Sequence, residues 1–204
     1  MKFDELNQLK RYFSIMELPE EDKEKRVSLG MLFYDAFFYI FLLIKAEVAV
    51  ALKSNDISEI TIDRDYYVRS LDGRIRDILE ENGLTYDEEY IPRLTEDVID
   101  TTARHLDDDY YFSQERALIV AQNEANTVMN GVDFQAALSS GKKYKTWITE
   151  GDTRVRPWHE EVDNKTIPID DMFAVGNDNL RFPHDYINGS AENLINCRCT
   201  CTYE

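Results

Sequence analysis

The chain has 204 residues, of which 43% are hydrophobic and 31% charged, a composition that predicts a globular protein with a buried core. Its formal net charge of −17 at pH 7 excludes a general nucleic-acid-binding surface, because such surfaces neutralise phosphates with Lys and Arg. The start "MKFDELNQLKRYF" lacks the cationic and apolar regions of a secretory signal, and three cysteines in such a chain fit a reducing compartment.

Residues 1–140 are glycine-poor and have the apolar spacing of helices. We expect helices over residues 20–53, 64–83, 89–106 and 114–141. The first of them follows Pro19 and begins with an acidic turn, which the positive end of a helix dipole favours. Ser113 is a suitable N-cap for the last helix, and Gly83 and Gly141 are suitable stops.

The segment "GMLFYDAFFYIFLLIKAEVAVAL" has the most membrane-like composition in the chain. Its longest uncharged run, residues 36–44, has nine residues, and Asp35, Lys45 and Glu47 interrupt the rest. A spanning helix needs about 20 mostly apolar residues. We therefore predict a buried core helix and no membrane span; a helix that faces a partner or a membrane surface is the alternative.

Residues 56–111 are strongly acidic, with 17 Asp and Glu against 6 Arg and no Lys. Within them, "HLDDDYY" lacks the spaced ligands, the glycine and the terminal glutamate of an EF-hand. We interpret it as a solvated acidic turn. An acidic helical region favours contacts with proteins over sequence-specific reading of DNA.

After Gly141 the sequence changes to short segments with strand composition, separated by loops rich in Asn, Asp, Gly and Pro. We expect strands in "KKYKTWIT", "KTIPI" and "INCRCTCTY", and in "EGDTRVRP" a turn followed by an extended segment. The sequence therefore predicts an α+β fold, with a helical region over residues 1–140 and a small β-containing module over residues 141–204.

Polar residues mark one face of the last expected helix. Arg116, Glu124 and Asn130 lie at offsets 0, 8 and 14, which places them within about 120° of one another around a helix. Two further pieces follow, "KTWITEGDTRVRPWHEEVDNKTIPIDDMF" and "NCRC". Their notable members are Trp147, Asp152, Arg154, Arg156, His159, Asp163, Asn196, Cys197 and Cys199.

In this order the three pieces resemble the phage Mu F-like family of head morphogenesis proteins, which includes the gene-product-7-type minor head proteins. The resemblance covers about residues 116–201. The family shows a helix with Arg, Ala-x-x-Glu and Asn, a Trp strand, Asp-x-Arg-Val-Arg-x-x-His, and a closing Asn-Cys-Arg-Cys. This chain departs from it at Asn123, where the family has Thr, and at Asn164, where Gly is frequent. Asn still supports a turn there because it tolerates positive φ.

The resemblance implies a minor capsid protein that associates with the phage portal, and with other capsid or scaffolding proteins, during procapsid assembly in the host cytoplasm. Such a protein can stay in the virion, in the capsid interior or at the portal vertex, and can affect DNA packaging or ejection. The resemblance implies neither catalysis nor a cofactor, and no sequence-specific nucleic-acid partner.

The motif also raises a question of charge pairing. Arg154 and Arg156 share one face if their segment is extended, and two adjacent guanidiniums need acidic partners. Glu124 on the preceding helix is an internal candidate. We expect an ion-pair network that joins the helix to the β-module; an anion or partner site and a catalytic site are the alternatives.

The three cysteines alternate along the last expected strand, so Cys197, Cys199 and Cys201 would share one face. We favour buried packing, since free cysteine is among the most buried residue types. The alternatives are redox thiols and a zinc site, in which Cys197 and Cys199 join His159 or His184.

An enzymatic hypothesis uses some of the same residues. His159 with Asp163, and His184 with Asp185, could form oriented imidazoles for acid–base chemistry. Together with the Cys-x-Cys pair, His159 and Asp163 would then serve a metal-dependent hydrolase or a phage-borne effector, although no nucleophile motif accompanies them. A cellular acidic adaptor protein is a third hypothesis.

Overall fold

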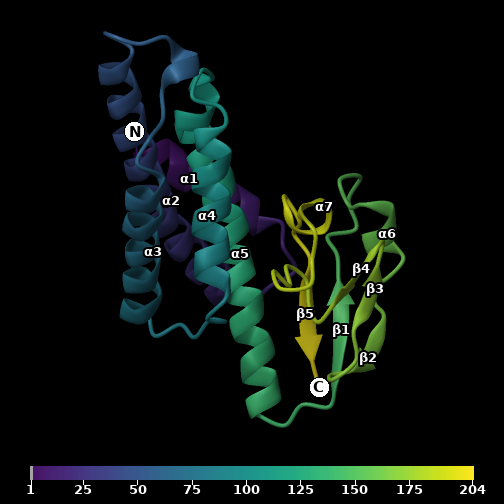
Figure 1. Ribbon diagram of the computed structural model, residues 1–204. Coiled ribbons are helices and arrows are strands. Elements are labelled where there is room, and N and C mark those ends of the chain that lie inside the picture. The colour runs from purple at the N-terminus through teal and green to yellow at the C-terminus, as the bar shows by residue number, and fades with distance from the viewer. Residues whose placement is uncertain (1) are drawn as a thin grey trace. The chain divides into compact units, whose positions relative to one another are not determined.

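The computed structural model describes residues 2–204 and has the α+β fold that the sequence predicts (Figure 1). The helices are α1 (Lys2–Ser14), α2 (Glu20–Ala51), α3 (Arg64–Glu81), α4 (Tyr90–Ala103), α5 (Gln114–Ser139), α6 (Pro157–Glu160) and α7 (Ala191–Leu194), with 3-10 turns η1 (Ile57–Glu59) and η2 (Asp109–Phe112). The strands are β1 (Tyr144–Ile148), β2 (Thr166–Pro168), β3 (Phe173–Val175), β4 (Asp178–Leu180) and β5 (Thr200–Tyr203).

The expected helices correspond to α2, α3, α4 and α5, and their ends follow local sequence signals; α1 was not among them. Ser113 caps α5, because its Oγ accepts a hydrogen bond from the backbone N–H of Arg116 (3.1 Å). Gly83 and Gly141 follow α3 and α5 with φ of 64° and 74°, a conformation that glycine adopts without strain.

Helix α2 contains the membrane-like segment, and most of that segment is buried. The best 18-residue window of α2 has a mean hydropathy of 2.0, long and apolar enough to cross a membrane by composition alone, and 56% of it is buried inside the protein. Phe33, Phe37 and Phe41 have no solvent exposure. This burial agrees with the predicted core helix, because a spanning helix would present its apolar side chains to lipid.

The chain forms two compact units, which we call the helical unit (residues 30–121) and the mixed unit (residues 1–29 and 122–204). Helices α2 and α5 each contribute residues to both. This division differs from the expected boundary at residues 140 and 141. The reason is that the later turns of α5 supply polar contacts to the β-containing segment, and Arg26 in the starting turns of α2 contacts those turns of α5.

In the helical unit, α3 and α4 lie side by side (Figure 1). Leu71, Ile75 and Leu79 are fully buried on α3, as the apolar spacing predicts. Arg64 at the start of α3 makes a two-pronged contact with the Asp100 carboxylate of α4, with Nη2 and Oδ2 3.1 Å apart.

The mixed unit contains a three-stranded antiparallel sheet of order β2-β1-β5 and a two-stranded sheet of β3 and β4. Trp147 of β1 pairs with Cys201 of β5, so the predicted Trp strand and the cysteine strand are neighbours. The C-terminal turns of α5 pack on this part of the chain through Phe134 and Ala137. A hydrophobic cluster of Phe134, Ala137, Ile169 and Phe182 thus joins α5 to the β-containing segment.

Two strand expectations are wrong in detail. "EGDTRVRP" does not become extended after its turn: residues 152–155 form turns and α6 begins at Pro157. The cysteine segment is a strand only from Thr200 onward. Its simple alternation also fails, since Arg198 and Thr200 are buried together with Cys199. The cause is that this segment has neighbours on both sides, which a two-faced alternation does not anticipate.

Lys145 on β1 provides a test of this core. Its side chain is fully buried, and its Nζ lies 5.0 Å and 5.5 Å from the ring centres of Phe134 and Phe173, without a hydrogen-bond partner among the described residues. Burial lowers the pKa of its amine. We expect Lys145→Met to raise the free energy of unfolding at pH 7 by about 1 kcal/mol, because methionine removes an unpaired buried charge and keeps the packing.

The measurement is urea unfolding at several pH values. Because the folded amine loses its proton at lower pH than the unfolded one, the wild type gains stability as the pH rises towards 10.5, so the advantage of the variant should shrink. Lys143→Met, an exposed neighbour on the same chain segment, serves as control and should change little. A destabilised Lys145→Met variant would contradict the expectation.

Candidate functional site

The backbone of Asn196 to Cys199 runs through a set of polar side chains in the mixed unit. The carbonyl of Cys197 accepts hydrogen bonds from Tyr12 Oη (3.0 Å), His184 Nε2 (2.6 Å) and Asn126 Nδ2 (3.4 Å). The carbonyl of Cys199 accepts one from Asn130 Nδ2 (3.1 Å). Hydrogen bonds to its backbone carbonyls therefore hold this segment in place, independently of the contacts of its own side chains.

Helix α5 supplies most of this support from one face. Asn123 Oδ1 accepts a hydrogen bond from the backbone N–H of Asn196 (2.8 Å), and Asn126 and Asn130 follow at helical spacing. Arg26 of α2, fully buried, donates to the amide oxygens of Asn126 (3.1 Å) and Asn130 (2.9 Å). Because arginine only donates, these contacts orient both amides with their NH₂ groups towards the cysteine segment.

His159 of α6 is oriented by a chain of hydrogen bonds. The indole N–H of Trp158 donates to Asn193 Oδ1 (2.6 Å), and His159 Nε2 lies 3.0 Å from the same oxygen. Asn193 Nδ2 donates to the carbonyl of Val175 (3.1 Å) and to Asp178 Oδ2 (2.8 Å). The Nε2 of His159 therefore carries a hydrogen, and its Nδ1 faces the other way.

That Nδ1 faces two sulfur atoms. It lies 3.4 Å from Cys199 Sγ and 3.7 Å from Cys197 Sγ, and all three ligand atoms lie within 4.8 Å of one another. All three side chains are buried. We call His159, Cys197 and Cys199 the His–Cys cluster. It brings together three of the four residues that the sequence suggested for zinc.

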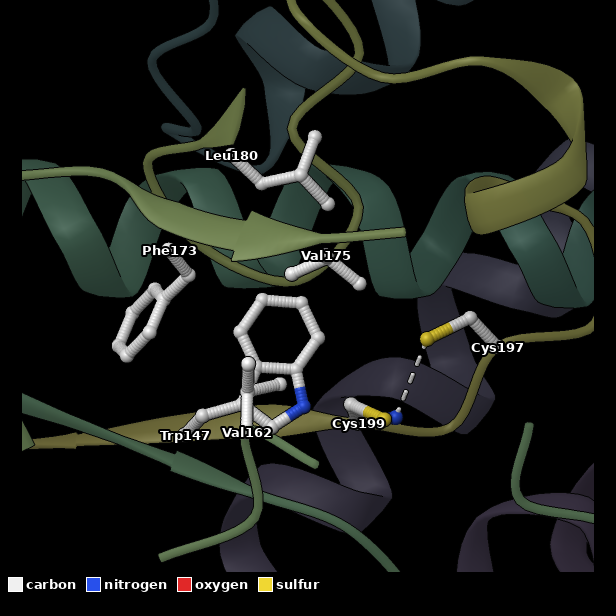
Figure 2. Close-up of a cluster of buried hydrophobic side chains, with 7 residues drawn as sticks. All are labelled: Trp147, Val162, Phe173, Val175, Leu180, Cys197 and Cys199. Carbon is white, nitrogen blue, oxygen red and sulfur yellow. Dashed lines mark hydrogen bonds between the residues drawn. The ribbon is translucent and has the colours of Figure 1, made fainter. Parts of the chain in front are cut away.

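An apolar shell packs on one side of the two thiols (Figure 2). It consists of Trp147, Val162, Phe173, Val175 and Leu180. The Trp147 ring also meets the His159 ring edge-on, with centres 5.7 Å apart. The favoured interpretation of Cys197 and Cys199 as buried packing residues agrees with this shell, while Cys201 is only partly buried against it.

The pKa values of the two thiols are shifted in opposite directions. A hydrogen bond between them lowers the pKa of Cys197 and raises that of Cys199, so Cys197 is the better thiolate. Burial opposes the first shift and reinforces the second. The backbone N–H of Cys199 also donates to the Cys197 sulfur (3.4 Å), the contact that Figure 2 marks with a dashed line.

A small pocket of about 10 Å³ adjoins the cluster. His159, Cys197 and Cys199 line it together with Glu150, Arg156 and Arg198. This volume holds about one water molecule and no substrate. Burial raises the pKa of Glu150 to about 7.

The expected ion-pair network takes a different form. The guanidinium of Arg198 donates two short hydrogen bonds to the Asp152 carboxylate, at 2.7 Å and 2.8 Å. These bonds hold the pKa of that carboxyl well below its usual range. Arg154 meets the same Asp152 at 3.4 Å, and Arg156 donates to the carbonyl of Ile195 (2.6 Å). Arg154 and Arg156 do not share an extended face, because the segment turns into α6.

The proposed His–Asp pairs are also wrong. Asp163 Oδ1 accepts the backbone N–H of Thr149 (2.8 Å), and the adjacent Asn164 has a φ of 57°. Asp163 thus closes a turn, in which Asn tolerates positive φ as expected. Asp185 bonds Arg181 (2.6 and 2.9 Å).

His184 lies outside the His–Cys cluster. Its Nδ1 lies 3.2 Å from Thr127 Oγ1, and its Nε2 bonds the carbonyl of Cys197. Burial lowers the pKa of His184, but its interactions with Cys197 outweigh burial and raise it. His184 therefore supports the cysteine segment through the backbone and is not the ligand that the sequence left open.

Arg116 belongs to the helical unit, whereas Glu124 and Asn130 belong to the mixed unit. Its guanidinium donates to Thr102 Oγ1 and the Tyr111 carbonyl, both at 2.8 Å, and burial lowers its pKa to about 10. The polar residue at the start of α5 therefore contacts the helical unit, whereas those in its later turns contact the mixed unit.

Sequence reasoning missed Tyr12, Arg26, Asn126 and Asn193. The spacing of Asn123, Asn126 and Asn130 is the one signal that could have revealed part of this set, since i, i+3 and i+7 lie on one helix face. Tyr12 and Arg26 lie about a hundred residues or more from their partners, so no local pattern identifies them.

Comparison with known proteins places these residues in a family. The sequence model of the family described as "Phage Mu protein F like protein" matches residues 87–202, more than half of the chain. The chain therefore belongs to the phage Mu protein F like family, a family of phage head morphogenesis proteins. The match contains the His–Cys cluster and the supporting face of α5.

One curated relative is similar to part of the chain. It is described as NAD(+)--arginine ADP-ribosyltransferase EFV of Enterococcus faecalis (strain ATCC 700802 / V583), and it is 29% identical over 103 residues. The match covers 48% of this chain and 20% of that protein, so the chain spans one fifth of the relative's length. No solved structure matches the chain.

Proposed function

We propose that this protein is a minor head protein that joins the phage procapsid by binding the portal. The family match over residues 87–202 carries this proposal. The match includes the polar contacts that anchor the last segment of the chain to α5, and these contacts favour a rigid structural module. Assembly proteins need such modules because a docking face must keep its shape.

A structural role also accounts for the His–Cys cluster better than hydrolysis does. The adjoining pocket of about 10 Å³ has no room for a substrate, and Asp163 is engaged with the backbone of Thr149. The similarity to an ADP-ribosyltransferase concerns one fifth of that protein. The function that we propose for this chain therefore includes no transferase activity.

The portal-binding face that we propose lies on α2 in the helical unit. Leu32, Tyr39 and Val50 lie within about 20° of one another around the helix, and they are 39%, 44% and 64% exposed. A groove of about 450 Å³ runs between α2 and α3. Its charged lining residues are Asp35, Asp77 and Glu81, together with Arg74, whose guanidinium lies 4.0 Å from the centre of the Tyr39 ring. Exposed apolar side chains with acidic surroundings fit an amphipathic, basic segment of the portal.

The test is co-expression with the portal protein of the same phage, followed by affinity purification and native mass spectrometry. We expect a defined complex with the wild-type chain. The double variant Leu32→Asp/Val50→Asp should bind at least 10-fold more weakly, because both changes place charge in the apolar face. Both positions are exposed, so folding should be retained.

Met172→Asp is the matched control, since Met172 is 49% exposed but belongs to the mixed unit. It should bind the portal like the wild type. Failure of the wild-type chain to bind the portal would overturn the proposed function. Equal weakening by both variants would overturn only the assignment of the α2 face.

A further inference from the structure

In the His–Cys cluster, one nitrogen atom faces two sulfur atoms. A neutral imidazole nitrogen without hydrogen has one lone pair, and Nδ1 of His159 presents it to two sulfur atoms at 3.4 Å and 3.7 Å. It can accept a hydrogen from one thiol only. The second sulfur takes part in the hydrogen bonds of the cysteine segment, and it also lies beside this nitrogen without a hydrogen bond to it.

The contact of Trp158 with Asn193 shows that Nε2, on the opposite side of the His159 ring, carries a hydrogen. Indole is only a donor, so the atom of Asn193 that it meets is the oxygen, and the same oxygen must accept from His159 Nε2. Asn193 cannot turn around, because its NH₂ donates to Val175 and Asp178. Metal-binding histidines are oriented in this way, with the distal N–H donated to a fixed acceptor.

The distances match the edges of a coordination tetrahedron. With zinc–sulfur bonds of about 2.3 Å and zinc–nitrogen bonds of about 2.0 Å, a tetrahedral ion separates a ligand nitrogen from a ligand sulfur by about 3.5 Å. The two observed nitrogen–sulfur distances, 3.4 Å and 3.7 Å, lie on either side of this value. All three ligand atoms also lie within 4.8 Å of one another, close enough for one ion.

One contact also stabilises a thiolate at Cys197. The backbone N–H of Cys199 donates to the Cys197 sulfur, and a hydrogen bond of this kind stabilises negative charge on sulfur. The pocket of about 10 Å³ beside the cluster has room for a water molecule as the fourth ligand. Two soft thiolates and one imidazole form a donor set that suits zinc.

We propose that His159 Nδ1, Cys197 Sγ and Cys199 Sγ bind one Zn²⁺ ion, with a water molecule in the adjoining pocket as the fourth ligand. Both sulfurs bind the ion as thiolates, so any proton that they still carry is released when the ion binds. The ion joins α6 to the cysteine segment and thereby fastens the C-terminal part of the mixed unit. This proposal does not depend on portal binding.

The first test is metal content. The full chain is purified without a histidine tag or chelator and analysed by plasma mass spectrometry, with an expected value of about one zinc per chain. Cys199→Ser and His159→Ala should lose at least 10-fold in zinc affinity. Cys201→Ser is the matched control and should keep its zinc, since Cys201 is the one cysteine outside the cluster.

The second test uses the wild-type chain alone, so that it does not depend on whether the variants fold. Chelator-treated protein is titrated with zinc in weak buffer, and the melting temperature and released protons are measured. We expect a higher Tm with zinc and the release of protons when the ion binds. X-ray absorption should show two sulfur ligands and two lighter ones.

Three outcomes would overturn the proposal. The first is a metal-free chain that takes up no zinc while its thiols are reduced. The second is a chain with a different native metal, such as iron or copper. The third is a mass 2 Da below the reduced chain with Cys197 bonded to Cys199, which would assign the pair to redox chemistry.

Discussion

Arg26→Met should destabilise the protein by about 3–5 kcal/mol, the largest effect that we expect from a single substitution. Arg26 is fully buried, and its guanidinium bonds Asn126, Asn130 and, at 3.2 Å, Asp133. Methionine fills a similar volume but leaves two amide oxygens and a partly buried carboxylate without their donor. A buried acceptor that loses its partner costs the free energy of its desolvation.

The substitution should also loosen the cysteine segment. Without Arg26, nothing in this network orients the amides of Asn126 and Asn130 towards the carbonyls of Cys197 and Cys199. We therefore expect faster reaction of the thiols with a maleimide in the native protein, in addition to a lower midpoint in urea. The two readouts separate a local role of Arg26 from a general loss of stability.

Lys25→Met is the matched control because Lys25 is the neighbouring residue on α2. Its amine meets Glu21 at 3.0 Å on the surface, and half of its side chain is exposed. Surface ion pairs contribute little, so Lys25→Met should leave the free energy of unfolding nearly unchanged. A cost of Arg26→Met no greater than that of Lys25→Met would show that the buried network is not stabilising.

Asp185→Asn should destabilise the protein by about 3 kcal/mol. The Asp185 side chain is fully buried and accepts hydrogen bonds from the backbone and side chain of Arg181 and from Asn188 Nδ2 (2.7 Å). Burial raises the pKa of this carboxyl, but the contacts with Arg181 outweigh it, and the net pKa is lowered. An amide cannot satisfy the same donors, because one of its two polar atoms is itself a donor.

The pH dependence has a defined sign. A carboxyl whose pKa is lowered by folding stabilises the protein above its ordinary pKa of 3.8, and this contribution disappears as the pH falls below that value. The difference between the wild type and Asp185→Asn should therefore be complete at pH 7 and shrink in acid. Asp171→Asn, at an exposed position, is the control and should show no such trend.

Much of the architecture follows from local sequence. The helices α2 to α5 appear in the apolar spacing, and Ser113, Gly83 and Gly141 mark their ends because capping and positive φ are properties of a few neighbouring residues. The buried character of α2 was also predictable. The motif pieces predicted the family, which the match over residues 87–202 confirms.

The limits of the strands and the boundaries of the compact units were harder to predict from the sequence. The sequence predicts an extended segment through Arg154 and Arg156. In the structure, the turn at Asp152 and the start of α6 at Pro157 change the direction of the chain. The boundary expected at residue 140 overlooked the contribution of α2 and α5 to the mixed unit. Composition changes mark where secondary structure changes, whereas compact units depend on which side chains meet.

The sequence by itself determined the α+β class, the main helices and the acidic character, and it left either His159 or His184 as a candidate ligand beside Cys197 and Cys199. The three residues that come together in the structure are His159, Cys197 and Cys199. Only the tertiary structure decided that these three converge, that His184 bonds a backbone carbonyl, and that Asn193 and Arg26 orient the neighbouring groups. The physical reason is distance along the chain: His159 lies about 40 residues from Cys199, and Arg26 about 100 from its amides. Contacts over such separations arise from packing, which no local pattern records.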